Sequence, residues 1–503
     1  MYRSLNDALR AQFGCKVYKL ALDSGCTCPN RDGTRGVGGC RFCGAGSGEF
    51  AAGSGDLDIQ LAAAKARVNQ KALDAKYIAY FQSYSATYAP VETLRARFSA
   101  VLNRAEIVAL SVATRPDCLP GDVLDLLEEL NQKKPVWVEL GLQTIHPTTA
   151  AAMNRCFSLR EFDEAVAALK SRGITVVVHM ILGLPGESRA EMLDTADYIA
   201  HCGADGVKFH LLHIVDGAPL ADDWRAGQVP VLELDAYLDL LAACVKRMPP
   251  EMVIHRLTGD GDKKTLLAPL WSGDKKHVLN ELRRQFAQKG VEQGAHFRPD
   301  TETELLTVYS EDFRSLGTAI RERAHTQALL HEVVHCWIIS QREDGLYLWF
   351  QQRAETKRDY PGCYDLAVGG HVGAEEDPAL ALFREIREEV GLTVEPERPI
   401  YLGVHRKTME NRSLCDQEFA RIYLLRDDAP CFQPGPEVRR MVRVRLEDAL
   451  ARMKGVTETP AVSHIGEALT ISENQWAGYP LELTEVVLPA LAIIDGVTAY
   501  RTP

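Results

Sequence analysis

The chain has no hydrophobic run of the roughly 18–20 residues that a membrane-spanning helix needs. Its first residues also lack the apolar stretch of a secretory signal. Basic residues are not in excess, because 57 Lys and Arg stand against 69 Asp and Glu, a net charge of −12 that disfavours loose electrostatic binding of nucleic acid. The 13 cysteines are odd in number, which disfavours a disulfide framework and predicts a cytoplasmic protein with reduced thiols or a metal site.

What is present is an ordinary globular composition in a chain long enough for two or three domains. The 503 residues are 46% hydrophobic and 25% charged, which excludes extended disorder, collagen and coiled coil. The pattern of strands and helices changes near residue 300. We therefore expect one domain over 1–290, a linker over 291–301 and a second domain over 302–503. The polar stretch 273–299 is interpreted as belonging to this connection.

The first domain alternates short apolar strands with amphipathic helices. Such alternation predicts a parallel sheet covered by helices, as a barrel or a partial barrel, with a doubly wound open sheet as the alternative. The expected strands are 17–22, 77–82, 107–114, 136–143, 175–182 and 207–212, and the expected helices are about 57–74, 91–103, 120–131, 160–171, 188–202 and 231–247.

A cysteine cluster follows the first expected strand. Cys28, Cys40 and Cys43 lie on one turn-rich loop, where a barrel of this type places its chemistry. Three thiolates can hold three irons of a [4Fe–4S] cluster and leave the fourth iron open to a small ligand. With Cys26 as a fourth thiolate, the same residues could form a structural zinc site. From these cysteines alone, the two readings carry similar weight.

Polar residues on later strands favour the iron–sulfur reading. Glu139 and Gln143 share a face of one strand, His179 lies on the next, and Lys208 and His210 share a face of the following strand. A packed barrel interior is normally filled with branched apolar side chains. Polar groups in step on three strands therefore predict a cavity for a polar ligand, which a zinc knuckle would not explain.

Several separated runs, in order along about residues 1–285, resemble a radical SAM family related to the Elongator catalytic subunit. The runs are Thr27-Cys-Pro-Asn-Arg-Asp-Gly33, Gly38-Gly-Cys-Arg-Phe-Cys43, Gly46-Ser-Gly-Glu-Phe50, Thr114-Arg-Pro-Asp-Cys-Leu-Pro120, Trp137-Val-Glu-Leu-Gly-Leu-Gln-Thr144, Leu182-Gly-Leu-Pro-Gly-Glu187 and Ile254-His-Arg-Leu-Thr-Gly-Asp260.

The resemblance implies a partial (β/α)6 TIM-type barrel and a [4Fe–4S] cluster at which S-adenosylmethionine (SAM) is cleaved with one electron, from a donor such as flavodoxin or ferredoxin. By analogy with the Elongator subunit, tRNA is a candidate substrate, without support from the charge balance. Cys26 is then a bystander, and Phe81-Gln82-Ser83 replaces a Gly-Gly-Glu stretch that often contacts SAM. The implied cluster ligands are Cys28, Cys40 and Cys43, and the candidate SAM contacts are Glu139, Gln143 and Arg155.

A second motif begins at Gly370 and carries three glutamates on an expected helix. Asp377 suits the helix N-cap, Pro378 the first helical position and Gly391 the helix end. Glu385, Glu388 and Glu389 then lie on one side of the helix, with Arg384 four residues before Glu388 as an expected partner. Clustered carboxylates select Mg²⁺ or Mn²⁺, which can neutralise a diphosphate and activate water. The alternative is a solvated acidic helix face, which the agreement of the Gly, Arg and Glu spacings disfavours.

The motif resembles the Nudix signature, and its flanks resemble the Nudix branch similar to isopentenyl-diphosphate isomerase. This implies an α/β/α sandwich over about 302–500. His371 lacks the cysteine that precedes the corresponding histidine of the isomerases, and Cys363 is interpreted as a packing residue. The resemblance therefore favours hydrolysis of a nucleoside diphosphate linked to another moiety, with a nucleotide or RNA recognition module as the alternative. His331 and His335 could contact metal or substrate, but a structural role is expected of both.

Overall fold

The computed structural model describes residues 2–44, 55–68, 76–259, 264–410, 415–477 and 480–494. The chain forms two compact units, Met1–Thr303 and Glu304–Pro503. Part of one expected helix, residues 69–74, and two parts of the radical SAM runs, residues 46–50 and Asp260, lie outside the described residues. None of the described helices combines the length and apolar character that crossing a bilayer requires.

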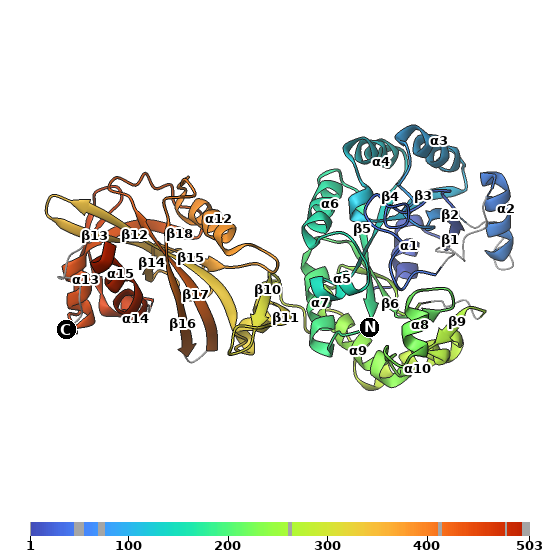
Figure 1. The fold of residues 1–503 in the computed structure, drawn as a ribbon. Helices are drawn as coiled ribbons and strands as arrows, with labels where there is room; N and C mark the ends of the chain where they lie inside the picture. Colours follow the sequence, from blue (N-terminus) through green and yellow to red (C-terminus); the bar gives the residue numbers. More distant parts are fainter. Residues whose placement is uncertain are drawn as a thin grey trace. The chain divides into compact units, whose positions relative to one another are not determined.

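The first unit is built on a seven-stranded parallel sheet with the order β1-β2-β3-β4-β5-β6-β8 (Figure 1). Helices follow the strands and cover the outer face, so the sheet is a barrel left open between β1 and β8. The strands are β1 (Val17–Leu22), β2 (Lys76–Phe81), β3 (Ile107–Thr114), β4 (Val136–Gln143), β5 (Thr175–Leu182), β6 (Gly206–Leu211) and β8 (Val253–Arg256). The helices are α1 (Leu5–Phe13), α2 (Leu57–Val68), α3 (Val91–Leu102), α4 (Gly121–Lys133), α5 (Pro147–Ala152), α6 (Leu159–Ser171), α7 (Arg189–His201), α8 (Leu220–Arg225), α9 (Leu234–Arg247) and α10 (Lys275–Gln288).

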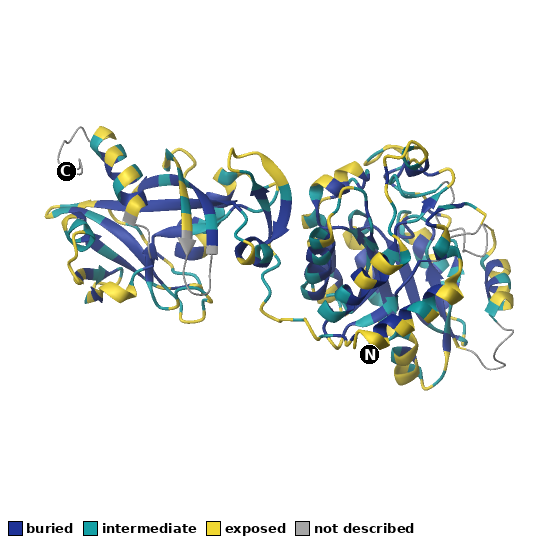
Figure 2. Cartoon of the chain, turned by 90° about the horizontal axis from the view of Figure 1, so that it is seen from below, coloured by how far each residue is buried: buried dark blue, intermediate teal, exposed yellow. Residues whose placement is uncertain are grey.

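Local sequence explains why the helices begin where they do. Ser158 and Ser188 each form a capping box with the glutamate three residues later, at the start of α6 and α7. The outer faces of the helices are exposed while the strands are buried (Figure 2). Val138, Leu140 and Val176 are among the strand residues with no exposed surface. The expected partial barrel is confirmed, and the open doubly wound alternative is excluded.

The interpretation of residues 273–299 as a polar connection is wrong, because residues 275–288 form α10. Asp274 caps this helix by accepting a hydrogen bond from the backbone N–H of His277 at 3.0 Å. Val278, Leu282 and Phe286 recur every fourth residue and form its buried face. Three apolar residues on a mostly charged helix are enough to dock it, and the average polarity of the stretch conceals them.

The second unit contains a mixed eleven-stranded sheet. Its main path is β11-β10-β12-β13-β18-β19-β20, with β14 paired to β13, β15 and β17 paired to β12, and β16 paired to β17. The strands are β10 (Leu305–Tyr309), β11 (Ser315–Ile320), β12 (His331–Arg342), β13 (Gly345–Arg353), β14 (Tyr364–Leu366), β15 (Val368–His371), β16 (Ile400–Glu410), β17 (Cys415–Arg426), β18 (Val438–Arg445), β19 (Glu458–Ser463) and β20 (Ala468–Ser472). The helices are α11 (Arg321–Thr326), α12 (Pro378–Val390), α13 (Leu446–Met453), α14 (Pro480–Glu482) and α15 (Leu488–Ile494).

Strand β12 shows how this sheet is packed on both faces. Val333 and Trp337 point to a core that includes residues of α13 and α15. Val334 and Ile338 point to the opposite core, which includes residues of α12. Because successive side chains of a strand alternate between faces, a strand that is apolar at both sets of positions must be covered twice. The expected α/β/α sandwich is confirmed.

A buried acid joins the last helices to β12. One carboxylate oxygen of Glu482 lies 2.7 Å from His335 Nδ1, and the other accepts a hydrogen bond from Trp337 Nε1 at 2.6 Å. Burial alone would lower the pKa of His335, but Glu482 raises it. Burial alone would raise the pKa of Glu482, but His335 and Trp337 lower it. Both groups therefore stay charged between their ordinary values of 4.5 and 6.5.

Replacing Glu482 by Gln is expected to destabilise the β12 region by about 3 kcal/mol, because a buried histidine loses its counter-ion. The raised pKa of His335 makes its contribution complete below pH 6.5 and lost as the pH rises through the folded value. The lowered pKa of Glu482 makes its contribution present above pH 4.5 and lost as the pH falls. Hydrogen exchange of the β12 amides between pH 4.5 and 8 measures the loss of stability. This loss is largest between pH 4.5 and 6.5, where both groups are charged.

Glu485→Gln is the matched control for this experiment. Glu485 contacts His405 at 3.1 Å, but its side chain is 58% exposed, so its loss should cost less than about 1 kcal/mol. Equal protection of β12 in the Glu482→Gln variant and the unmodified protein at pH 6 would contradict the assigned role of the pair.

Candidate functional site

The three cysteines of the N-terminal motif lie on the loop after β1, at the carboxyl end of the parallel strands. The carbonyl of Cys28 accepts a hydrogen bond from the N–H of Arg31 at 2.8 Å, and the carbonyl of Cys40 accepts one from the N–H of Cys43 at 2.9 Å. Gly39 has a φ of 78°, and a Cβ at this position would come within 2.9 Å of the Arg31 guanidinium. Glycine therefore lets the loop fold back tightly enough to direct all three thiols to one cavity.

The thiols lie in a positively charged environment. A hydrogen bond from Cys43 and the nearby charge of Arg115 lower the pKa of Cys40 to about 7 against the effect of burial, and Asn30 also donates to its sulfur at 3.5 Å. The same hydrogen bond, together with burial, raises the pKa of Cys43 well above its ordinary value. Asp117 holds Arg115 in place at 2.8 Å. A buried thiolate beside a second thiol fits a soft cationic group such as an iron–sulfur cluster.

Cys26 lies apart from this arrangement. Its sulfur is buried 3.6 Å from the carbonyl oxygen of Ala86, and burial raises its pKa. Among the described residues, no three cysteine sulfurs lie within 4.8 Å of one another. A tetrahedral zinc site, with each sulfur about 2.3 Å from the metal, needs a more compact set. The geometry therefore favours three cluster ligands over a four-thiolate zinc site.

The cavity beside the cysteines has a volume of about 290 Å³, and Glu139 is one of the residues that line it. This fully buried carboxylate accepts hydrogen bonds from Lys19 Nζ at 2.5 Å, from His179 Nε2 at 2.9 Å, and from Lys208. Burial alone would raise the pKa of Glu139, but the two ammonium groups and the imidazole hold it well below its ordinary value. Burial lowers the pKa of Lys208 to about 7, although Glu139 opposes that shift. Glu139 thus organises the cationic groups around it.

Gln143 and Arg155 have different places relative to this cavity. Gln143 lines it, at the end of β4, with a φ of 65°. Arg155 is buried and donates to the carbonyls of Leu142 and Thr144 at 2.9 and 2.5 Å, one on either side of Gln143. Arg155 therefore clamps the strained backbone that presents the Gln143 amide, instead of lining the cavity itself.

His210 adds an unsatisfied polar atom to the cavity wall. Its ring lies 5.0 Å from that of His179, and its buried Nε2 has no hydrogen-bond partner. Burial holds the pKa of His210 well below its ordinary value, so the imidazole is neutral. A buried orphan nitrogen facing a cavity is the arrangement expected of a ligand contact.

In the second unit, α12 presents the glutamates of the Nudix-like motif. Asp377 accepts from the N–H of Ala379 at 2.8 Å, and Gly391 ends the helix with a φ of 70°, as predicted. Glu389 accepts from the N–H of Gly369 at 3.0 Å. A Cβ at Gly370 would overlap the carboxylate of Glu385, so glycine is required for this acid to approach β15.

The electrostatics of these acids fit a divalent cation. Burial raises the pKa of Glu385 to about 7 even though Arg384 opposes the shift. Burial and the charge of Glu385 raise the pKa of Glu389 to about 8. Glu388 is different, because its side chain is 60% exposed. A hard cation would remove the cost of ionising the two buried acids.

Arg384 contacts Glu388 only at 3.5 Å. Its stronger partners are Glu376, at 2.9 Å through two nitrogens, and Glu385, at 2.6 Å. The predicted Arg384–Glu388 pair is therefore secondary. The helix spacing indicated which residues could meet, but the loop before the helix supplies the better partner.

These acids share a cavity of about 610 Å³ with Arg384 and three further cations, Arg321, Arg353 and Lys357. Carboxylates that can hold a metal, next to guanidinium and ammonium groups that can hold phosphate, form a suitable site for a diphosphate. Cys363 is not among the residues that line this cavity, in line with the packing role expected of it.

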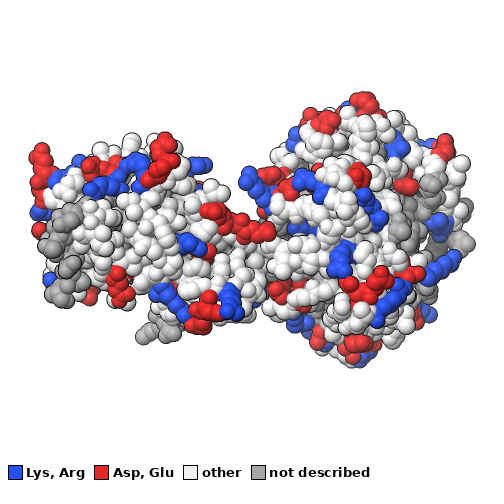
Figure 3. All heavy atoms as spheres, in the orientation of Figure 1, with Lys and Arg blue, Asp and Glu red and all other residues white. Residues whose placement is uncertain are grey.

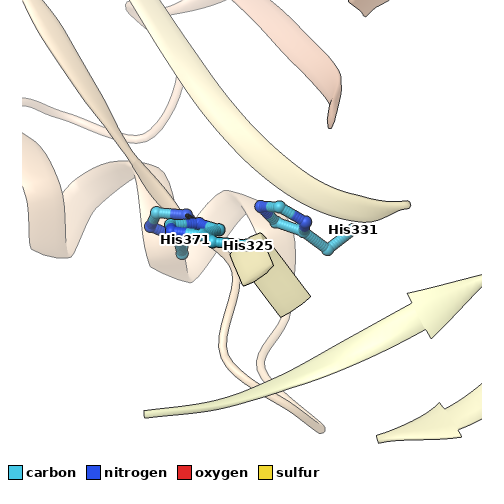
Figure 4. Close-up of side chains that lie close together, drawn as sticks. All are labelled: His325, His331 and His371. Carbon is cyan, nitrogen blue, oxygen red and sulfur yellow. Dashed lines mark hydrogen bonds between the residues drawn. The ribbon is translucent and has the colours of Figure 1, made fainter. Parts of the chain in front are cut away.

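A cluster of three imidazoles lies at another part of the same cavity (Figure 4). His325 Nε2 and His371 Nε2 are 3.1 Å apart, and the rings of His331 and His371 stack at 5.2 Å. Asp416 lies 3.8 Å from His325 and 3.7 Å from His331. Burial lowers the pKa of His325 to about 4 and holds that of His371 well below its ordinary value. Neutral imidazoles with a carboxylate can hold a transition metal.

Sequence reasoning missed most of this cluster. It assigned His331 a structural role, whereas the structure places its ring with the other two imidazoles. His335 is held by Glu482, as a structural residue would be. His371 and Asp416 come from β15 and β17, which pair with β12, and His325 comes from α11, which packs against β17. The one signal in the sequence was that three histidines lie near the motif. Without knowledge of the strand pairing, this signal is too weak to assign a metal site.

Comparisons with known proteins agree with both halves of this description. Residues 28–199 match the radical SAM superfamily, residues 204–288 the radical SAM C-terminal domain and residues 329–462 the NUDIX domain. YtqA of Bacillus subtilis is 46% identical over 299 residues, 59% of this chain and 93% of that protein.

Two further relatives match one unit each. Elongator complex protein 3 of Saccharomyces cerevisiae is 27% identical over 160 residues, 30% of this chain and 28% of that protein. The Nudix hydrolase CA_C0446 of Clostridium acetobutylicum is 28% identical over 128 residues, 25% of this chain and 62% of that protein. Both family resemblances are confirmed, and the radical SAM family implies a [4Fe–4S] cluster and SAM, as the Nudix family implies a divalent metal. The chain belongs to the radical SAM superfamily and carries a Nudix domain after its radical SAM region.

Proposed function

We propose that Cys28, Cys40 and Cys43 hold a [4Fe–4S] cluster and that SAM occupies the adjoining cavity. The observation that carries this proposal is that the three thiols line the same cavity as the polar faces of β4, β5 and β6. When bound, the cluster and SAM supply one-electron cleavage of the sulfonium and abstraction of a hydrogen atom from a substrate.

The chain's own residues position and shield this chemistry. Arg31 and Arg115 line the cavity beside the thiols and offset the negative charge of thiolate ligands. Gln143 offers an amide to the polar end of SAM, and Arg155 fixes the backbone that presents it. Glu139 orients Lys208 and His179 instead of contacting SAM through a spare oxygen. The buried strand residues exclude water from the cavity.

Serine replacement of Cys28, Cys40 or Cys43 is expected to abolish stable cluster binding, because each removes one of three thiolate ligands. After anaerobic reconstitution, the unmodified chain should hold about four irons and cleave SAM reductively, whereas each variant should hold little iron. Iron analysis and formation of 5′-deoxyadenosine measure the two effects.

Cys26→Ser is the matched control and should retain both iron and SAM cleavage, because Cys26 does not line the cavity and its thiol contacts the Ala86 carbonyl. A colourless protein with stoichiometric zinc, or iron content that is equal in all four variants and the unmodified chain, would contradict the proposed ligand set.

We propose that the Nudix domain hydrolyses a small nucleoside-diphosphate-type substrate with Mg²⁺ or Mn²⁺ held by Glu385, Glu388 and Glu389. The support is the combination of two acids with raised pKa values, Glu385 and Glu389, and four cations in one cavity. Isomerase chemistry is not proposed, because glycine precedes His371 where the isomerase-like branch has its cysteine. A module that recognises nucleotide or RNA without hydrolysis is the second candidate.

Glu389→Gln is expected to reduce Mg²⁺-dependent hydrolysis by about 100-fold or more, because the metal loses a ligand that stabilises charge in the transition state. ADP-ribose and diadenosine polyphosphates are suitable trial substrates, assayed by release of nucleoside monophosphate. Glu375→Gln alters an exposed acid of the same motif region and should leave the rate unchanged. Binding of these nucleotides without turnover would support the recognition module instead.

The imidazole cluster is a second candidate cation position in the same cavity. His371→Ala is expected to remove one of two Mn²⁺ binding events, and Glu389→Gln the other, because the donor sets do not overlap. Electron paramagnetic resonance of Mn²⁺ titrations counts the sites. Identical stoichiometry in the His371→Ala variant and the unmodified chain would show that the imidazoles do not bind this cation.

The cellular setting belongs to the same proposal. A cytoplasmic location suits reduced thiols and an oxygen-sensitive cluster, and flavodoxin or ferredoxin would supply the electron. The connection at 291–301 would separate the two activities. We retain tRNA as a trial substrate of the radical SAM unit by analogy with Elongator complex protein 3, a relative over 160 residues.

A further inference from the structure

The open side of the barrel contains a second cavity. Strands β1 and β8 are the two edges of the seven-stranded sheet and do not pair with each other. A cavity of about 680 Å³ lies beside them, lined by β1, β8, the chain before and within α1, and the first turn of α10. We call it the side groove. The residues that line it belong neither to the cysteine loop nor to the cavity of the Nudix domain.

The charge of the side groove is opposite to that of the whole chain. Five cationic residues line it, and no carboxylate does so among the described residues. The chain as a whole has a net charge of −12, and acidic and basic side chains are interspersed on the face drawn in Figure 3. The cationic residues of the side groove are Lys16, Lys19, Lys208, Arg256 and Lys275.

The side groove is continuous with the proposed SAM cavity. Tyr80, Gln82, Lys208 and Arg256 line both spaces. Lys208 donates to the Tyr80 hydroxyl at 3.1 Å, so the two residues form the partition between the cavities. A molecule in the side groove could therefore extend into the space where hydrogen abstraction is proposed, without passing the cysteine loop.

The inner end of the groove places two amines around one carboxylate. Among the described residues, Glu139 is the only acid in contact with Lys19 and Lys208. Both ammonium groups also contact the Tyr80 ring, at 4.7 and 4.5 Å from its centre. Two buried or half-buried cations around one carboxylate are costly unless an anion completes the balance.

A polar atom in the groove wall also lacks a partner. His255 lies on β8 with its ring 5.6 Å from that of Trp137, and its buried Nδ1 makes no hydrogen bond. Buried side-chain nitrogens of this kind are normally satisfied. The unsatisfied Nδ1 of His255 and the cationic lining of the groove are separate observations, and both indicate a polar ligand.

We propose that the side groove binds a small phosphorylated substrate with two or more negative charges and directs its reactive part past Tyr80 into the SAM cavity. Cations spread from Lys16 to Arg256 suit several phosphate oxygens better than one carboxylate. The rings of Tyr2 and Tyr18 offer apolar walls for the rest of the molecule. The net charge of the chain disfavours a long polyanion. This inference rests on the proposed radical SAM function and names its substrate class.

The test is lysine labelling of the full chain in the presence of inorganic tripolyphosphate. EDTA is included so that the Nudix domain holds no metal. Limited acetylation followed by mass spectrometry compares Lys16 and Lys275, which are exposed and line the groove, with Lys276, which is exposed and does not. We expect acetylation of Lys16 and Lys275 to slow about fivefold or more at saturation, with Lys276 unchanged.

Two exposed substitutions sharpen the result without risk to the fold. Lys275→Gln should weaken the protection of Lys16, because one phosphate partner is lost, whereas Lys276→Gln should leave it intact. Lack of protection at Lys16 and Lys275, equal slowing at Lys276, or equal protection by citrate at matched ionic strength would each overturn the phosphate assignment.

The experiment is separate from the test of the cluster, because tripolyphosphate needs neither iron nor SAM to bind. Protection of Lys16 and Lys275 in a chain that never holds iron would support the side-groove proposal and contradict the proposed radical function. A chain that holds its cluster and cleaves SAM but shows no protection would remove only the side-groove inference.

Discussion

The buried carboxylate of Glu139 is the constraint on which the interior of the first unit depends. It lies inside the sheet with no exposed surface and holds Lys19, Lys208 and His179, which come from three other strands or their flanks. Without it, two ammonium groups would face each other in a space of low polarity. With it, the same groups form a polar interior that apolar strands could not provide. The polar lining of this cavity is therefore organised by one acid on β4.

The two proposed sites would hold a cation in different ways. The first offers soft thiols on a glycine-rich loop beside Arg31 and Arg115. The second offers oxygen ligands on a rigid helix, with imidazoles from three other elements nearby. In both, a glycine allows a functional group to come close to the backbone, Gly39 beside Arg31 and Gly370 beside Glu385. The proposed thiol ligands of the loop and oxygen ligands of the helix thus suit different metals.

Sequence periodicity predicted the elements that are regular over their whole length. Six of the seven parallel strands of the first unit agree with prediction within one residue at either end, because near-continuous apolar runs bounded by turns leave little choice. The short strand β8 was not predicted. The caps of α12 were readable from Asp377, Pro378 and Gly391 for the same local reason. Helix α10 was missed because its buried face is only a few residues wide.

What could not be predicted depends on contacts between distant segments. The imidazole cluster requires β15 and β17 to pair with β12, and no local pattern encodes that pairing. The position of Arg155 behind Gln143 follows from the path of the chain after β4, not from the residue type. The predicted partner of Arg384 on the helix, Glu388, likewise proved secondary to Glu376 in the preceding loop.

The incomplete closure of the barrel also leaves an unprotected strand. Among the described residues, the segment before α1 pairs with β8 on its open side, where Ser4 bridges Ile254 and the carbonyl of Arg3 accepts the N–H of Ile254 at 2.9 Å. These few residues cover part of the β8 edge and hinder another polypeptide from pairing with it. An affinity tag fused at this end would lie against both the edge and the groove beside it, so a tag at the opposite terminus is the better choice for preparing the protein.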